Sequence, residues 1–92
     1  MMKGQKFEEQ VAKYMGGKPI GGPGEPDYKR GGVDGEAKDW NKRMGKSDIM
    51  EEVQKGRDEI VSRLGFTDDA VTYKNRYQPK VKLVDWKTKK TF

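Results

Sequence analysis

Residues 26–40 read PDYKRGGVDGEAKDW, and this stretch decides the fold that the sequence predicts. Two short extended runs flank Gly31 and Gly32, and a two-residue Gly-Gly loop between such runs strongly indicates a β-hairpin. Counting outward from the turn places Asp27 directly opposite Glu36. Directly opposed residues point to the same face of a sheet, with Cβ atoms roughly 4.5–5.5 Å apart. The sequence therefore predicts a hairpin on which two carboxylates meet. The other expected pairs are Arg30 with Val33, Lys29 with Asp34 and Tyr28 with Gly35.

Lys38 joins the two carboxylates, because it lies two residues beyond Glu36 and side chains of a strand alternate between faces. Two carboxylates side by side repel each other unless a cation lies between them. Mg²⁺ takes oxygen ligands of this kind, usually one or two carboxylates with waters and phosphate oxygens. A lysine ammonium beside the metal can position water or neutralise charge that develops on a phosphate. The pattern indicates a metal-dependent phosphodiesterase site; the alternative is a surface hairpin with solvated charges.

The absence of two residue types restricts the chemistry further. The chain has no histidine and no cysteine. Histidine general bases, HNH-type sites, the usual zinc sites, thiol nucleophiles and disulfides are therefore excluded. Hydrolysis would have to use carboxylates, lysine, tyrosine or a hard metal ion. Asp27, Glu36 and Lys38 form the one constellation in the sequence that meets this restriction.

Length and charge point to a small domain with a polyanionic partner. The chain has 92 residues, of which 32% are hydrophobic and 38% charged. It is expected to form a single domain over residues 1–92 with a thin core, and a homodimer would bury more apolar surface. The net charge of +5 favours nucleic acid as a partner. No apolar run approaches the ~18 residues of a membrane span, and no signal peptide is recognisable, so the expectation is a cytoplasmic protein without membrane contact.

The hairpin residues also resemble the signature of a known superfamily. Pro26-Asp27, a spacer and Glu36-Ala37-Lys38 resemble the motif of the PD-(D/E)xK nucleases, which include restriction endonucleases and archaeal Holliday-junction resolvases. The resemblance implies that Asp27 and Glu36 bind Mg²⁺ or Mn²⁺ and that the Ala37 carbonyl is a further ligand. It also implies that Lys38 positions the attacking water.

A fourth candidate comes from the first predicted helix, residues 5–15. Phe7 and Val11 lie on its apolar face, and Glu8 lies at the edge of that face. The spelling Gly4-x-x-Phe7-Glu8-x-x-Val11 is similar to the first helix of the superfamily, where a glutamate often completes the metal site. Glu8 is therefore a candidate catalytic residue and metal ligand; the alternative is an ordinary solvated helix face.

The later part of the chain is similar to the Mrr-type restriction endonuclease domain. The similarity lies in residues 65–70, GFTDDA, and residues 81–85, VKLVD. The glycine- and aspartate-rich stretch of that family is spelled differently here, as Gly-Glu-Pro-Asp ending at Asp27. This departure leaves open whether Asp27 or Asp34 is the metal-binding aspartate, since Asp34 lies two residues before Glu36 on the same strand face. The cross-strand position and the Pro-Asp dipeptide favour Asp27.

A basic loop follows the hairpin at residues 41–46. Its cations, Lys42, Arg43 and Lys46, lie beside the proposed metal site and are candidates for phosphate contacts. Trp40 alternates onto the face of the site residues, where it either stacks on a base or packs into the core.

The helix after this loop has two possible ends. Ser47 is the expected N-cap. The helix either stops at Gly56, before a short strand at residues 59–62, or continues to about residue 64, since an interior glycine costs only ~1 kcal/mol. The similarity to the Mrr-type domain favours the stop at Gly56. The remaining expectations are a loop over residues 18–26, a helix capped by Thr67 and closed by Pro79, a strand over 80–86, and loose ends at 1–4 and 87–92.

The sequence therefore predicts a small α/β, restriction-endonuclease-like core, with a mixed sheet around a central Gly-Gly hairpin and flanking helices. The expected function is a Mg²⁺-dependent endonuclease acting on DNA, either restriction-like or junction-resolving. One alternative is a basic nucleic-acid-binding module whose nuclease-like site is inactive. A third class is an interaction or regulatory protein, which salt-sensitive DNA affinity would argue against.

Overall fold

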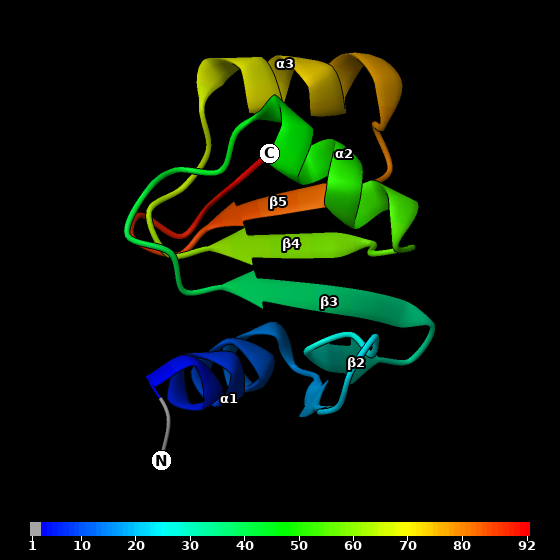
Figure 1. The fold of residues 1–92 in the computed structure, drawn as a ribbon, viewed down its shortest axis with the longest axis vertical. Coiled ribbons are helices and arrows are strands. Elements are labelled where there is room, and N and C mark those ends of the chain that lie inside the picture. Colours follow the sequence, from blue (N-terminus) through cyan, green and yellow to red (C-terminus); the bar gives the residue numbers. More distant parts are fainter. Residues whose placement is uncertain (1–2) are drawn as a thin grey trace.

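In the part of the chain that the structure describes, six strands form one mixed sheet and three helices pack on it (Figure 1). The structure, a computed structural model, describes residues 3–92, with side chains from Lys6 onward. The strands lie in the sheet in the order in which they occur in the chain. The α/β class predicted from the sequence is confirmed. The elements are α1 (Lys3–Met15), β1 (Lys18–Pro19), β2 (Tyr28–Arg30), β3 (Val33–Lys38), α2 (Lys46–Gln54), β4 (Glu59–Ser62), α3 (Asp68–Tyr77), β5 (Lys82–Asp85) and β6 (Lys90–Thr91).

The central strands β3, β4 and β5 run parallel, whereas β1, β2 and β6 pair antiparallel with their neighbours. Parallel neighbours need a crossover connection, and here α2 and α3 provide the two crossovers. Both helices lie on one side of the sheet, and α1 lies on the other (Figure 1). The carboxyl ends of the parallel strands meet at one edge, where Lys38, Ser62 and Asp85 occupy matching positions.

The core has two layers, one on each side of the sheet. In β4, Ile60 packs with residues of α2 and α3, while Val61 packs with residues of α1. In β5, Leu83 and Val84 repeat this alternation, as the period of two in a strand requires. A sheet covered on both faces needs apolar residues at consecutive positions. This is why β4 and β5 each carry two consecutive buried apolar residues.

The hairpin is formed by β2 and β3, with Gly31 in the left-handed region at φ +60°. Tyr28 lies opposite Gly35, is fully buried, and its hydroxyl donates a hydrogen bond to Glu59 Oε1 at 2.8 Å. A Cβ atom at Gly35 would lie 2.0 Å from Cζ of Tyr28. The tyrosine ring therefore occupies the space that a side chain at Gly35 would need. The other pairs of this ladder are Lys29 with Asp34 and Arg30 with Val33.

Asp27 lies one residue before β2, outside the strand ladder. The prediction that it pairs directly with Glu36 in the ladder is therefore wrong. Its N–H donates to the Gly35 carbonyl at 2.9 Å, and its carboxylate accepts a hydrogen bond from the Ala37 N–H, also at 2.9 Å. The Asp27 side chain is thus held near the end of β3 by the Ala37 N–H and not by strand pairing.

The stop at Gly56 is confirmed, because α2 ends at Gln54, Gly56 has φ +86°, and β4 follows. The predicted N-cap at Ser47 is wrong. Gly45 is the N-cap, and the Asp48 carboxylate accepts a hydrogen bond from its N–H at 2.9 Å. Thr67 caps α3 as predicted, since its hydroxyl accepts from the N–H of Ala70 at 3.3 Å.

The expectations for the ends and for the glycine-rich loop need correction. Residues 87–92 are not loose: β6 pairs with β5, and Leu83 and Phe92 exchange backbone hydrogen bonds of 3.1 and 2.8 Å. Phe92 also packs against the core beneath α2 and α3, which explains why the end is held. The loop predicted over 18–26 contains β1 at its start. Of residues 1–4, the last two belong to α1, and Met1 and Met2 lie outside the described residues.

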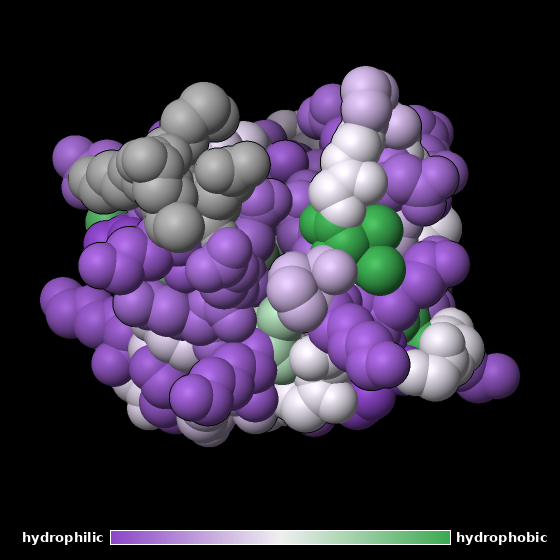
Figure 2. Space-filling model, turned by 90° about the horizontal axis from the view of Figure 1, so that it is seen from below, coloured by the Kyte–Doolittle hydropathy of each residue, from purple (hydrophilic) through white to green (hydrophobic). Residues whose placement is uncertain are grey.

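The face that carries α1 is mainly hydrophilic where it is coloured in Figure 2, with hydrophobic atoms in small separate spots. Across the part of the chain that the structure describes, no helix combines the length and the hydrophobicity that crossing a membrane requires.

Candidate functional site

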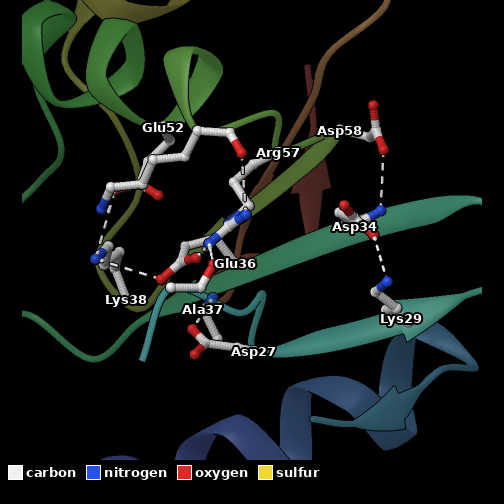
Figure 3. A network of polar contacts seen from close by, with 11 residues as sticks. Asp27, Lys29, Asp34, Glu36, Ala37, Lys38, Glu52, Arg57 and Asp58 are labelled. Carbon is white, nitrogen blue, oxygen red and sulfur yellow. Dashed lines mark hydrogen bonds and ion pairs between the residues drawn. The ribbon is translucent and has the colours of Figure 1, made fainter. Parts of the chain in front are cut away.

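The candidate site lies where β3 ends, between the loop that leads into β2 and the inner side of α2 (Figure 3). Glu36, Lys38, Glu52 and Arg57 gather on the side of α2, and Asp27 approaches Ala37 from the side of the preceding loop. The chain thus brings charged groups from four separate segments to one strand end.

Glu36 is buried and engaged by two cations. Its Oε1 accepts a hydrogen bond from Arg57 Nε at 2.9 Å, and its Oε2 lies 3.4 Å from Lys38 Nζ. Arg57 also donates to the carbonyls of Lys55 and Gly24, at 3.1 and 3.4 Å. The arginine therefore ties the glycine-rich loop and the end of α2 to the site carboxylate.

Lys38 lies between two carboxylates, because its Nζ is 3.4 Å from Glu36 Oε2 and 3.5 Å from Glu52 Oε2. Burial lowers the pKa of Lys38, but the charges of Glu36 and Glu52 outweigh it and raise the pKa above its ordinary value. The lysine is therefore a cation at neutral pH, suited to orienting water and to holding negative charge. Glu52 is only 3% exposed, and its Oε1 finds no hydrogen-bond partner among the described residues.

Among the described carboxyl groups, Asp27 has the pKa that differs most from its ordinary value. Its pKa is raised to about 8, chiefly by burial and in addition by the neighbouring Glu8 and Glu36, whereas the Ala37 N–H acts to lower it. Two acidic side chains, Glu8 and Glu36, therefore lie close enough to disfavour the negative charge on Asp27. Such a cluster holds a proton at neutral pH unless a cation takes the proton's place.

Glu8, on α1, shares an open cavity of about 410 Å³ with Asp27. The glycine-rich loop forms the rest of its wall, together with Glu9. The cavity gives solvent and small ligands access to the Asp27 carboxyl group. The loop residues that line it are Pro19, Ile20, Gly21 and Gly22.

Asp34 lies near the start of β3, whereas Asp27 contacts Ala37 near the end of that strand (Figure 3). Its backbone N–H donates to Asp58 Oδ2 at 2.9 Å, and its carboxylate lies 3.7 Å from Lys29 Nζ. This position favours Asp27 as the aspartate that works with Glu36.

The predicted metal ligands at this strand end include two carboxylates, Asp27 and Glu36. Among the described residues, no group of three or more acidic, histidine or cysteine side chains is arranged to hold a metal ion. Mg²⁺ commonly binds through one or two carboxylates and completes its shell with water and phosphate oxygens. Asp27 and Glu36 supply two carboxylates, and the pKa of Asp27 is raised chiefly by burial, with Glu8 and Glu36 adding to the rise. The Ala37 carbonyl and Glu8 remain predicted further ligands.

The predicted phosphate-binding side chains follow this strand end in the chain. Lys42, Arg43 and Lys46 are exposed, and Lys46 is the first residue of α2. Trp40 is half-buried and packs against the core beneath α2 and α3, with Lys38 Nζ 5.4 Å and Lys42 Nζ 5.1 Å from its ring centre. The tryptophan thus has one ring surface in the core and cations beside it.

Two residues of the site escaped the sequence analysis, Glu52 and Arg57. Glu52 lies three positions after the buried Ile49, so helical spacing could have placed it on the inner face of α2. Arg57 follows the glycine that ends α2, and no sequence pattern indicates its direction.

Comparison with known proteins leaves the family open, because no protein family model, no curated protein and no solved structure matches the chain.

Asp27→Asn is expected to stabilise the protein at alkaline pH. The folded-state pKa of Asp27 is raised from 3.8 to about 8, so its favourable contribution is complete below the lower value and is lost as pH rises through about 8. Asparagine carries no charge and avoids this loss. Because Asp27 is partly exposed, we expect a modest gain of about 1 kcal/mol, or about 4–8 °C in melting temperature.

Thermal melts of both proteins without metal, at about pH 5 and about pH 8.5, check this expectation. The gain should be larger at the higher pH. A variant that melts below the wild type at the higher pH would show that the charged carboxylate stabilises the fold.

Arg57→Met is expected to lower the free energy of unfolding by about 2–4 kcal/mol, because it leaves Glu36 in a buried position with one cation fewer. The matched control is Lys29→Met, since the Lys29 side chain is 47% exposed and the Arg57 side chain 6%. Breaking the exposed pair should cost no more than about 1 kcal/mol. Urea unfolding measures both; equal effects would refute a structural role for the buried pair.

Proposed function

We propose that the protein is a metal-dependent endonuclease of the PD-(D/E)xK type, with a restriction-endonuclease-like core, and that DNA is its substrate. The observation that supports this most is the convergence of Asp27, Glu36 and Lys38 at the end of one strand, with a raised pKa at Asp27. A divalent-metal phosphodiesterase site commonly uses one or two carboxylates with a cation beside them, and these three side chains are of that kind.

In this proposal Asp27 and Glu36 would hold Mg²⁺ or Mn²⁺, with the Ala37 carbonyl and Glu8 as further ligands. The bound metal would act as a Lewis acid on the phosphate and favour the attack of water. Lys38 would orient the attacking water and stabilise negative charge on the phosphate, because it is held as a cation beside Glu36. Arg57 would keep Glu36 in place through its hydrogen bond of 2.9 Å.

The exposed cations Lys42, Arg43 and Lys46 would hold the phosphate backbone, with Trp40 beside them. Such contacts fix the position of a nucleic acid without reading its sequence. Cutting both strands of a duplex would require two such sites, and for this reason we propose a homodimer on DNA.

A second candidate function has a specific observation in its favour. Glu36 already pairs with both Arg57 and Lys38, so its charge is compensated within the protein. This favours a nucleic-acid-binding module whose nuclease-like site is inactive.

Cutting of supercoiled plasmid and of a four-way junction, with Mg²⁺, with Mn²⁺ and with chelator, separates the two functions. The nuclease proposal expects metal-dependent cutting, and the preferred substrate would distinguish a restriction-like from a junction-resolving activity. Salt-sensitive binding of DNA without cutting under any condition would favour the binding module. If the protein neither cuts nor binds DNA, both functions are refuted.

A further inference from the structure

Two tyrosines on α3 form an aromatic surface away from the strand end that carries the acidic residues. Tyr73 and Tyr77 lie four residues apart, with ring centres 5.5 Å apart and planes inclined by 40°. Tyr73 packs against the core beneath α2 and α3, whereas Tyr77 is 61% exposed. Their spacing in the sequence is typical of a core-facing stripe. The structure instead leaves the second ring in solvent, where the fold does not require it.

Cations surround these rings. Lys46 Nζ lies 6.0 Å from the centre of the Tyr73 ring. A shallow depression of about 260 Å³ is lined by Lys46, Tyr73, Tyr77 and Arg76, together with Asp69 and Thr72. The lining therefore has two cations and one carboxylate, and it contains no aliphatic side chain. Exposed aromatic rings flanked by cations are the usual means of binding unpaired nucleotides, because a base stacks on the ring and phosphates contact the cations.

We propose that this surface, made of Lys46, Tyr73, Arg76 and Tyr77, binds single-stranded nucleic acid, with a base stacked on Tyr77 and phosphates on Lys46 and Arg76. Only an unpaired base can present its face to a ring in this way, so the surface selects single strands or overhangs. The proposal extends the proposed function, because Lys46 also ends the basic loop beside the catalytic residues. It does not require the site to cut, since binding needs no metal.

The test is the binding of a fluorescent single strand of about 12 nucleotides, within the range of such sites, measured by anisotropy in chelator over a series of salt concentrations. Thymidine and uridine oligomers serve as the DNA and RNA probes. Tyr77→Ala should weaken binding about tenfold at every salt concentration, since stacking does not release counterions. Tyr77→Phe should bind like the wild type. Arg76→Ala should reduce the salt slope by about 0.7, the value of one phosphate contact on a single strand.

The matched control is Tyr14→Ala. Tyr14 is 53% exposed but lies on α1, on the other side of the sheet. The Tyr14→Ala protein should bind the oligomers as the wild type does. Melting temperatures check that each variant is folded.

The proposal is overturned if the wild type binds neither oligomer, if Tyr77→Ala binds as well as the wild type, or if Tyr14→Ala is equally impaired. If the protein never cuts but binds single strands through Tyr77, the nuclease proposal is refuted and the proposed single-strand binding surface is supported. If the wild type cuts and the Tyr77→Ala protein binds single strands normally, the nuclease proposal is supported and the proposed binding surface is refuted.

Discussion

Gly35→Ala is expected to unfold the protein, or to lower its free energy of unfolding by more than about 3 kcal/mol. The added Cβ would lie 2.0 Å from Cζ and 2.2 Å from Cε1 of Tyr28. The ring has little freedom to move away, because Tyr28 is fully buried and its hydroxyl is bonded to Glu59, which also pairs with Arg30. Circular dichroism and urea unfolding measure the loss.

Gly32→Ala is the matched control for this substitution. Gly32 lies in the loop of the same hairpin, and a Cβ there would meet nothing within 4 Å. Alanine at this position should therefore leave the free energy of unfolding within about 0.5 kcal/mol of the wild type. Equal stability of the Gly35→Ala and Gly32→Ala proteins would mean that Tyr28 does not lie across Gly35 in solution.

The second large effect is expected on cutting. Glu36→Gln should reduce the rate of metal-dependent DNA cleavage at least about 100-fold. The amide keeps the shape of the side chain, but it loses the negative charge that would hold the metal and that lies 3.4 Å from Lys38 Nζ. Initial rates on plasmid, with melting temperatures of the same preparations, separate lost chemistry from lost structure.

Asp34→Asn is the control for this variant, because Asp34 lies on the same strand and the same face but contacts Lys29 and Asp58 instead. It should cut at about the same rate as the wild type, because its side chain does not contact Glu36 or Lys38 among the contacts of the site. A loss as large as that of Glu36→Gln would make Asp34 the metal-binding aspartate and contradict the assignment of Asp27.

Local patterns in the sequence were sufficient where one residue determines the backbone. Gly56 has a positive φ that other residues avoid, which made it one of two possible ends for α2, and the family resemblance rather than the local pattern favoured it. Thr67 could be identified as a cap, because a hydroxyl before two acidic residues suits the start of a helix. The register of β2 and β3 follows by counting once the two turn residues are known.

Features that depend on contacts distant in sequence could not be predicted. Asp27 lies outside the ladder and its carboxylate accepts the Ala37 N–H, a bond that no period in the sequence reports. Arg57 reaches Glu36 across 21 residues of chain. Phe92 holds the C-terminal end through tertiary packing, although the residues before it read as a solvated basic tail.

The most direct test of a metal-dependent site at Asp27 and Glu36 compares plasmid cutting by the wild type and by Asp27→Asn in Mg²⁺. We expect chelator to stop cutting by the wild type and the variant to cut at least about 100-fold more slowly, although the variant melts no lower than the wild type at alkaline pH. Cutting by the variant at the wild-type rate, or wild-type cutting that chelator does not change, would contradict it.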